Sequence, residues 1–413
     1  MDIVVWGMVM NGDAGKIAKL PTHHFRVILF CELLHHAKDI LVATSRYMRA
    51  SFEVILGHKV FMNFSRHDTH MHGGSGSFTA KIVRLNLRHT WTTTMSSSSY
   101  RDTLHVAYWR DGITGYGEGA PIIRYHEDAE SARKAAESMG DLLLAANPMQ
   151  FSNIMEGIFQ RFQDEWAAKA AVDISLMDWV CKRLEIPLYA YFGLDPRDAP
   201  LTTFSIGIDT PEITRVKVKE AEEYPVLKVK VGLDTDEDTI SAIRSVTSKP
   251  LRADANEGWK DKEEAVRKIK WLETQGVEFV EQPMPSDMLD EMRWVRERVH
   301  MPIIADESCQ RASDIPKLKG IFDGVNVKLD KSGGILEAYR MISIAKSLGM
   351  KTMLGCMISS SVSVTAAAHL SPCVDFADLD GNLLVANDPF QGVQVERGKL
   401  ILPNRPGLGL TMR

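Results

Sequence analysis

Short segments rich in β-forming residues recur along the second half of the chain, and each ends in polar residues. They begin about 23 to 28 residues apart, at Thr203, Val226, Leu251, Phe279, Pro302, Val325, Lys351 and Phe376. Helical patterns lie between them; Asp261 and Glu264, for example, are spaced for a capping box, and Gly276 can end the helix that follows. Strands and helices that alternate in this way predict parallel strands joined by right-handed crossovers. Eight such strands predict a β/α barrel with its site at the carboxyl ends of the strands, and a doubly wound open sheet is the alternative.

The remainder of the chain lacks this period. Residues 81–119 alternate like a hairpin with Asp111 and Gly112 at its turn, and residues 167–184 predict a helix. The residues after Asp388 again predict short strands. We therefore expect a barrel over residues 201–384, an α+β capping domain over residues 78–200, and a segment, 385–413, that returns to the capping domain. Residues 1–77 are an extension for which the sequence gives no fold.

The overall composition excludes several classes of partner. The formal net charge is −5 and no dense block of Lys and Arg occurs, so a nucleic acid partner is not expected. The apolar run over residues 25–34 is too short to span a bilayer, so no membrane association is expected. The five cysteines are far apart and include no C-x-x-C pair, which indicates a reducing compartment and a cytoplasmic protein.

Three carboxylates end three consecutive predicted strands: Asp254, Glu281 and Asp306. Neighbouring strands lie about 4.8 Å apart, so these anions would repel one another strongly unless a cation neutralised them. Oxygen ligands without histidine or thiolate favour a hard ion, and Mg²⁺ is the natural choice. The alternative is that each carboxylate separately caps a helix or forms its own salt bridge.

Lysines lie on both sides of these carboxylates in the strand order. Lys228 and Lys230 share the inward face of one predicted strand, and Lys328 ends the strand on the far side. Barrel strands are buried on both faces, so inward lysines are costly unless they meet anions or serve a function. The bland alternative is that a lysine near the barrel rim only pairs with a structural carboxylate.

A metal ion flanked by two bases suits removal of a proton from the carbon next to a carboxylate. The enediolate that forms needs a divalent ion and an ammonium to stabilise its charge. The lysine that acts as base must be neutral, and we expect burial and nearby cations to lower its pKa. Two lysines on opposite sides of a planar intermediate allow the proton to leave one face and return to the other, which is epimerisation.

The strand ends carry, in order, K-x-K, D-A-N, E-Q-P, A-D-E-S and N-x-K, and the capping region carries GYGEGAP at residues 115–121. Together these motifs resemble the enolase superfamily, in its muconate-lactonising subgroup, from about Phe78 to the end of the chain. The resemblance implies an α/β fold made of a modified (β/α)7β TIM-type barrel and an α+β capping domain. It also implies functions for particular residues: Lys230 and Lys328 as the acid/base pair, Asp254, Glu281 and Asp306 as Mg²⁺ ligands, and Lys228 and Ser205 as contacts of the substrate carboxylate.

The eighth predicted strand ends in D-L-D, which places Asp378 and Asp380 on one face. Two inward carboxylates away from the metal ligands make an anionic pocket that suits a substrate ammonium. The motif resembles the D-x-D of dipeptide epimerases, where the aspartates hold the free amino terminus. The alternative is that one aspartate caps a turn and the other is solvated.

The sequence departs from relatives that act on Ala-Glu dipeptides. Those relatives tend to carry an arginine in the first cap loop, whereas residues 92–99 read TTTMSSSS, and Ser359 stands where they often have a glutamate. We therefore expect a preference for small or apolar dipeptides, against which only the nearby Arg101 argues.

Other functions remain open at this stage. N-acylamino acid racemases, o-succinylbenzoate synthases and muconate cycloisomerases could use the same metal and lysines, but none of them needs an ammonium site at Asp378 and Asp380. A non-catalytic binding protein on the same fold is the alternative from a different class. The expected partner is a small-molecule substrate, and assembly into a homo-oligomer is left open.

Overall fold

The computed structural model describes residues 76–94 and 96–413. The extension predicted over residues 1–77 therefore lies, except for its last two residues, outside the described part of the chain. The second half forms an eight-stranded parallel sheet in which every strand pairs with its neighbours in chain order. The strands are β4 (Phe204–Ile206), β5 (Leu227–Lys230), β6 (Leu251–Asp254), β7 (Val277–Glu281), β8 (Ile303–Ala305), β9 (Gly324–Val327), β10 (Lys351–Gly355) and β11 (Phe376–Asp378).

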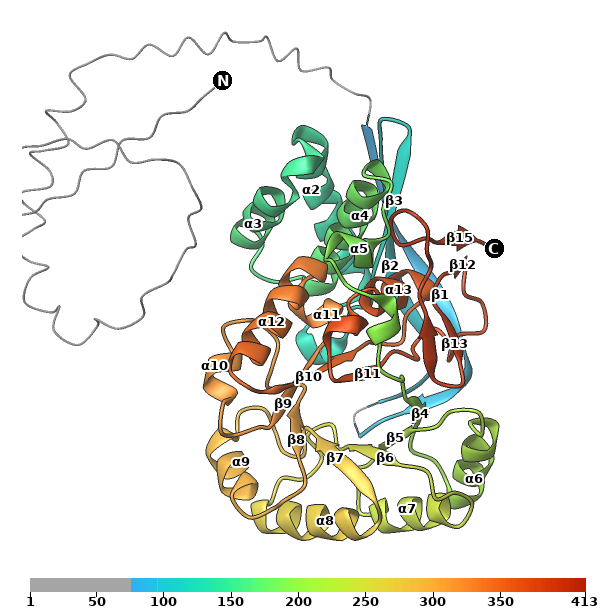
Figure 1. Cartoon of the computed structure of the whole chain (residues 1–413), viewed down its shortest axis with the longest axis vertical. Helices are drawn as coiled ribbons and strands as arrows, with labels where there is room; N and C mark the ends of the chain where they lie inside the picture. The colour runs from blue at the N-terminus through green and yellow to red at the C-terminus, as the bar shows by residue number, and fades with distance from the viewer. Residues whose placement is uncertain (1–75, 95) are drawn as a thin grey trace, which may run out of the picture. The chain divides into compact units, whose positions relative to one another are not determined.

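The two edges of this sheet meet, so the sheet closes almost completely into a barrel. Thr202 forms a parallel bridge with Ala377, and the N–H of Thr203 donates to the carbonyl of Ala377 at 3.3 Å. Helices connect the strands: α6 (Pro211–Glu220), α7 (Asp236–Arg244), α8 (Lys262–Thr274), α9 (Leu289–Arg296), α10 (Ile315–Leu318), α11 (Leu329–Ser332), α12 (Ile335–Ser347) and α13 (Ser361–Ala368). The predicted α/β fold, a (β/α)7β barrel, is confirmed, and the doubly wound alternative is wrong (Figure 1).

The helix after β6 shows how local sequence sets the barrel units. Asp261 caps α8 by accepting a hydrogen bond from the N–H of Glu264 at 2.7 Å. Glu264 does not complete the predicted capping box, because its carboxylate lies 3.5 Å from the ammonium of Lys268 one turn later. The buried side of the helix carries Ala265, Ile269 and Leu272, at the spacing of one apolar face.

The region before the barrel is a three-stranded antiparallel sheet covered by helices. The strands are β1 (Gly76–Thr92), β2 (Ser97–Arg110) and β3 (Ile113–Gly119), and the helices are α2 (Ala129–Ala145), α3 (Phe151–Arg161), α4 (Trp166–Arg183) and α5 (Leu188–Tyr191). This region also contains the short 3-10 helices η1 (Ile123–Tyr125), η2 (Pro148–Gln150) and η3 (Pro196–Asp198). A further 3-10 helix, η4 (Ser371–Cys373), lies between α13 and β11 of the barrel. The turn between β2 and β3 has positive φ at Asp111 and Gly112, as a tight hairpin requires. The glycine at position 117 allows close packing, because a Cβ there would overlap the backbone of Ala171 in α4.

The last part of the chain lies against this first region. It contains β12 (Phe390–Gln391), β13 (Gln394–Glu396), β14 (Lys399–Ile401) and β15 (Thr411–Met412). The ring of Phe390 lies 5.2 Å from that of Tyr116 in β3, and the N–H of Leu408 donates to Asp178 in α4 at 2.7 Å. In the sequence, the barrel is therefore flanked by two segments, one before β4 and one after β11, and these two segments contact each other. In the part of the chain that the structure describes, no helix combines the length and the apolarity that crossing a bilayer requires.

One buried histidine joins the barrel to both flanking segments. The Nδ1 atom of His369, at the end of α13, lies 3.3 Å from the N–H of Tyr189, and its Nε2 atom lies 3.2 Å from the carbonyl of Leu408. The side chain is fully buried, and this burial lowers the pKa of His369 from 6.5 to about 4. The folded protein therefore holds a neutral imidazole over a range in which the unfolded chain binds a proton.

We expect the free energy of unfolding to fall as the pH is lowered from about 6.5 to about 4, by up to about 3 kcal/mol from this residue. Urea unfolding of wild type and His369→Gln at several pH values measures the effect, and the variant should show a shallower fall. His300→Gln, at an exposed histidine, is the control and should follow wild type. Equal pH dependence in His369→Gln and wild type would contradict the expectation.

Candidate active site

The three predicted carboxylates meet at the mouth of the barrel. Asp254 and Glu281 end β6 and β7 and are register partners, and Asp306 follows the last residue of β8. All three are buried, and one ligand oxygen from each lies within 4.8 Å of the other two. The carboxylates therefore converge on one point rather than capping separate helices. An all-oxygen set of this kind fits a hard divalent cation such as Mg²⁺.

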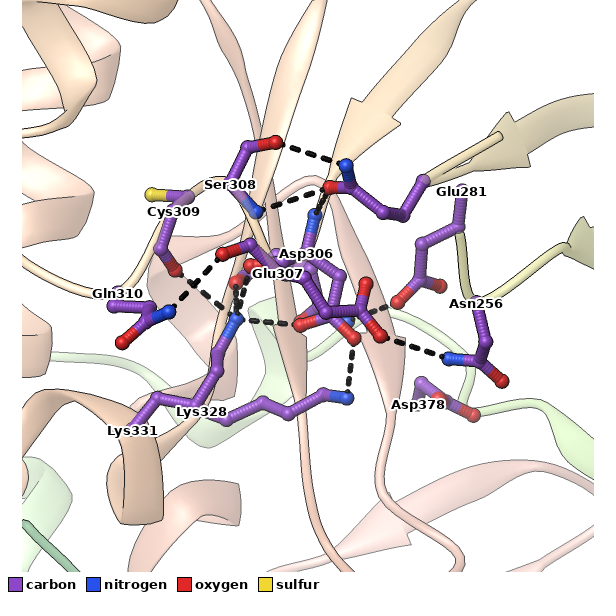
Figure 2. Close-up of polar contacts among 12 residues, drawn as sticks. Asn256, Glu281, Asp306, Glu307, Ser308, Cys309, Gln310, Lys328, Lys331 and Asp378 are labelled. Atoms are coloured by element: carbon purple, nitrogen blue, oxygen red, sulfur yellow. Dashed lines mark hydrogen bonds and ion pairs between the residues drawn. The ribbon is translucent and has the colours of Figure 1, made fainter. Parts of the chain in front are cut away.

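The predicted acid/base lysines lie on opposite sides of this triad. Lys230 ends β5 and its ammonium is 2.7 Å from Asp254 Oδ2, whereas Lys328 follows β9 and its ammonium is 2.7 Å from Asp306 Oδ2. In the sheet, β5 and β9 flank β6, β7 and β8, which carry the triad. Figure 2 shows Lys328 reaching Asp306, with Glu281 beyond it.

Burial and the neighbouring carboxylates act in opposite directions on the pKa of Lys328. Burial alone would lower the pKa of Lys328, but the charges of Asp306 and Glu281 outweigh burial and raise it above the ordinary value. The expected lowering counted a bound cation together with the neighbouring lysines, and it stays a prediction. The carboxylates hold the proton on Lys328 as long as their own charges are not neutralised.

The triad carboxylates differ in their affinity for a proton. Burial and the charge of Asp254 raise the pKa of Glu281 to about 7. Burial also acts on Asp254, but Lys228 and Lys230 outweigh it and hold the pKa of that carboxyl well below its usual range. The site therefore relieves part of its own repulsion by favouring a proton on Glu281, the carboxylate in the middle of the triad.

Lys228 lies at the centre of the anions and not at their edge. Its ammonium is 2.6 Å from Asp378 Oδ2, 2.8 Å from Glu281 Oε2 and 3.0 Å from Asp254 Oδ2, and only 2% of the residue is exposed. Burial would lower the pKa of Lys228, but these three carboxylates raise it well above its usual value. The lysine is thus a fixed positive charge with protein carboxylates as its partners.

Asp378 and Asp380 lie at the end of β11, as the sequence predicts. Asp378 is not separate from the carboxylate triad, because Lys228 connects it to Asp254 and Glu281. Asp378 also accepts a hydrogen bond from the hydroxyl of Thr203 at 2.5 Å. Asp380 accepts a hydrogen bond from the N–H of Ser205 at 2.6 Å, and burial and the charge of Asp378 raise the pKa of Asp380 to about 7.

Ser205 was expected at the substrate carboxylate, and the structure gives it other neighbours. Its N–H bonds Asp380, and its hydroxyl lies 3.4 Å from Asp378 Oδ1. Ser359, on the loop after β10, is fully buried and donates to the carbonyl of Met357 at 3.2 Å. The structure thus places Ser205 beside the two aspartates and Ser359 beneath the surface of its own loop.

Several residues that the sequence analysis did not assign also contact the triad. Asn326 donates to Glu281 Oε1 at 2.8 Å, and Lys331 lies 2.5 Å from Asp306 Oδ1. Gln282 accepts hydrogen bonds from the N–H groups of Asp306 and Ser308 at 2.9 and 3.1 Å. Asn326 could have been predicted, because it shares the inward face of β9 with Lys328. Lys331 lies in α11, where the period of the strand no longer applies.

The first region of the chain also contributes to this end of the barrel. Arg124, in η1, donates to Glu257 and, at 2.7 Å, to Glu307, the residue after Asp306. Glu307 accepts a second hydrogen bond from Asn256 at 3.2 Å, and Asn256 accepts one from Lys230 at 2.8 Å. Burial and the charge of Asp306 raise the pKa of Glu307 to about 8. No sequence period could have placed Arg124 here, because it lies outside the barrel.

Comparison with known proteins agrees with this geometry. The family model of the mandelate racemase / muconate lactonizing enzyme N-terminal domain matches residues 78–193, and the enolase C-terminal domain-like model matches residues 213–413. The chain is 43% identical over 339 residues to an L-Ala-D/L-Glu epimerase of Bacteroides thetaiotaomicron, covering 82% of this chain and 88% of the relative. It is 40% identical over 341 residues to an L-Ala-D/L-amino acid epimerase of Pedosphaera parvula, covering 80% of this chain and 97% of the relative.

Solved structures resemble the chain over the same residues. A dipeptide epimerase of Enterococcus faecalis, solved with Mg and the dipeptide L-Leu-L-Tyr, superposes with a TM-score of 0.77 at 32% identity over 81% of this chain and 98% of that one. The L-Ala-D/L-Glu epimerase of Bacillus subtilis, in a substrate-liganded complex, gives a TM-score of 0.78 at 29% identity over 81% and 98%. The barrel, the flanking α+β region and the carboxylate triad define an enolase-type protein. The chain belongs to the enolase superfamily, and within it the protein is an isomerase.

If the triad holds a divalent cation, Mg²⁺ should raise the unfolding midpoint of the protein, with about 2.7 kcal/mol of added stability at one hundred times its dissociation constant. Glu281→Gln removes one of three ligands and should abolish this rise. Glu278→Gln lies on the same strand but is exposed and pairs with Arg252, so it should keep the rise. Thermal unfolding with and without Mg²⁺ measures the effect, and an unchanged rise in Glu281→Gln would rule out the triad as the metal site.

Proposed function

We propose that the protein is a Mg²⁺-dependent dipeptide epimerase that inverts the α-carbon of the C-terminal residue of a dipeptide. The observation that carries the proposal is the position of Lys230 and Lys328, whose ammonium groups reach the carboxylate triad from the two strands that flank it. An enzyme that inverts a carbon centre needs a proton donor and a proton acceptor on opposite faces of that carbon. The relatives and neighbouring structures that carry the name epimerase support this reading.

The two lysines have complementary tasks in this mechanism. One of them, in its neutral form, takes the α-proton from one face of the substrate, and the other, as an ammonium, returns a proton to the opposite face. Asp254, Glu281 and Asp306 would hold Mg²⁺, which when bound supplies positive charge for the carboxylate of the substrate. Lys228 adds a fixed ammonium beside the same carboxylates and so reduces the net negative charge that an anionic substrate meets.

The dipeptide assignment depends on the pair at the end of β11. Asp380 is buried and accepts a hydrogen bond from the N–H of Ser205. Asp378 already has a positive partner in Lys228. A substrate ammonium would give Asp380 a positive partner of the same kind. The triad would then hold the carboxylate end of a short substrate and Asp380 its ammonium end, which supports a dipeptide over an N-acylamino acid. The complexes of the relatives, with L-Leu-L-Tyr for example, agree with this choice.

Rival functions make different demands on the same residues. An N-acylamino acid racemase, an o-succinylbenzoate synthase or a muconate cycloisomerase would use the triad and the lysines and leave Asp380 without an assigned task. A non-catalytic binding protein would have no need to keep both lysines and all three carboxylates together in one buried cluster.

We also retain a cytoplasmic location as a proposal, since Cys181, Cys309, Cys356 and Cys373 are all free thiols.

The side-chain preference is proposed as small or apolar. Residues 92–94 and 96–99, in the described part of the first loop, provide threonine and serine but no cation. Incubating the protein with a library of L,L-dipeptides in D₂O and following the gain of mass would measure the preference. A mass gain confined to dipeptides that contain glutamate would overturn it, and would direct attention to Arg101, which burial leaves with a lowered pKa.

We expect Lys328→Ala to block inversion while leaving exchange of the α-proton from one epimer of the substrate, because Lys230 can still act on its own face. Proton NMR in D₂O with each epimer separately distinguishes exchange from inversion. Lys351→Ala is the control, because Lys351 begins β10 at the far end of the strand and pairs with Asp375. Inversion by Lys328→Ala at the wild-type rate would exclude the two-base mechanism.

Asp380→Asn should reduce kcat/KM for a dipeptide by at least about tenfold, because the substrate ammonium loses a charged partner worth more than about 1.4 kcal/mol. The same variant should act almost as wild type on any N-acetylated dipeptide that the wild type accepts. Coupled chiral assays of the two substrates provide the comparison within one protein. Unchanged dipeptide turnover would remove Asp380 from the substrate site.

A further inference from the structure

Lys331 is a fourth lysine at the triad, and it is buried. It is the third residue of α11, the single helical turn that follows β9, and its side chain is fully buried. Its ammonium lies 2.5 Å from Asp306 Oδ1 and 2.7 Å from the carbonyl of Asp306. The carbonyls of Cys309 and Asn326 are each 3.0 Å away. Figure 2 shows Lys331 and Lys328 approaching Asp306 by separate paths.

These contacts separate Lys331 from the two lysines assigned to proton transfer. An ammonium has three N–H donors, and four acceptors surround that of Lys331, so no donor remains for a substrate. Among residues 76–94 and 96–413, the ammonium of Lys328 has one hydrogen-bond acceptor, Asp306 Oδ2. Lys328 is therefore available to a ligand in the site, whereas Lys331 is fixed within the protein.

The position of Lys331 determines which oxygen of Asp306 faces the other triad carboxylates. The ammonium of Lys331 contacts Asp306 Oδ1. It also contacts two backbone carbonyls, that of Asp306 after β8 and that of Asn326 in β9. Rotation of the Asp306 carboxylate would break this contact and leave the buried ammonium with neutral carbonyls alone, without a charged partner, which is costly. The Oδ2 atom consequently faces Lys328 and the other carboxylates.

We propose that Lys331 is a positioning residue for the metal centre: it holds Asp306 so that one oxygen, Oδ2, is presented to the cation. The inference rests on the metal-binding part of the proposed function. Groups that orient metal ligands in this way typically change metal affinity by about 10- to 100-fold when they are removed. Lys331 does this from a helical turn, while the ligand itself comes from the neighbouring strand.

Two simpler roles predict different results. If Lys331 only satisfies backbone carbonyls, its loss should lower stability and leave metal binding unchanged. If it acts only through its charge, its loss should tighten cation binding, because one repelling ammonium disappears from the site. Positioning predicts the opposite sign, namely weaker binding.

Calorimetric titration with Mg²⁺ alone distinguishes these cases. We expect Lys331→Met to raise the Mg²⁺ dissociation constant about 10- to 100-fold. Lys268→Met is the matched control, because Lys268 also binds an aspartate, Asp236, at 2.8 Å and a carbonyl, that of Leu233, at 2.9 Å, but belongs to α8. The control should lose thermal stability and keep the wild-type dissociation constant. Wild-type or tighter Mg²⁺ binding by Lys331→Met would overturn the inference.

A kinetic readout adds a second distinction. In Lys331→Met the Mg²⁺ concentration for half-maximal activity should rise, while kcat at saturating Mg²⁺ should stay close to wild type, because Lys230 and Lys328 are unchanged. A fall of kcat that saturating Mg²⁺ does not restore would contradict a positioning role. If the wild type binds Mg²⁺ but epimerises no dipeptide, the proposed substrate fails and the titration still tests Lys331.

A crystal structure of the wild type with Mg²⁺ keeps the test valid if Lys331→Met does not fold. We expect the ammonium of Lys331 to remain within hydrogen-bond distance of Asp306 Oδ1 while Mg²⁺ is bound by Oδ2. Mg²⁺ coordinated by Oδ1, with Lys331 displaced, would overturn the inference.

Discussion

The repulsion between buried carboxylates is the constraint on which this structure depends. Asp254, Glu281 and Asp306 are buried and place oxygens within 4.8 Å of one another, and Asp378 lies on the other side of Lys228. In a low dielectric such a cluster could not persist as bare anions. Four lysines compensate these four carboxylates, namely Lys228, Lys230, Lys328 and Lys331. The proposed metal ligands and the proposed bases thus occupy the same small volume.

The barrel makes this arrangement attainable because it brings consecutive strands to the same depth. Each β/α unit delivers one strand end to the mouth, so residues about 25 positions apart in sequence become neighbours across a ladder. The register of Lys230 with Asp254, and of Asp254 with Glu281, is a direct result. The sequence period therefore predicts the triad and its two flanking lysines without knowledge of any loop.

What the sequence could not predict lies outside the strands. Asp378 was correctly placed on the inward face of the last strand, but its depth was not foreseen, and it shares Lys228 with Asp254 and Glu281 of the triad. The contact of Lys331 with the triad was not predicted, because a helical turn interrupts the strand pattern after Lys328. Arg124 was not predicted at the site, because its contact with Glu307 joins two parts of the chain that are far apart in sequence. Local patterns encode the strand ends, whereas tertiary packing determines which side chains surround them.

The two flanking lysines are consequently supported by different parts of the molecule. On the side of Lys328, Asp306 is held by Lys331, and both belong to the barrel. On the side of Lys230, the support runs through Asn256 and Glu307 to Arg124, which precedes the barrel in the chain. A change in the packing of η1 on the barrel would thus reach Lys230 through hydrogen bonds, and Lys328 through the electrostatic interactions of Tyr125 with Lys328 and Asp306. The flanking region is for this reason part of the site and not merely its cover.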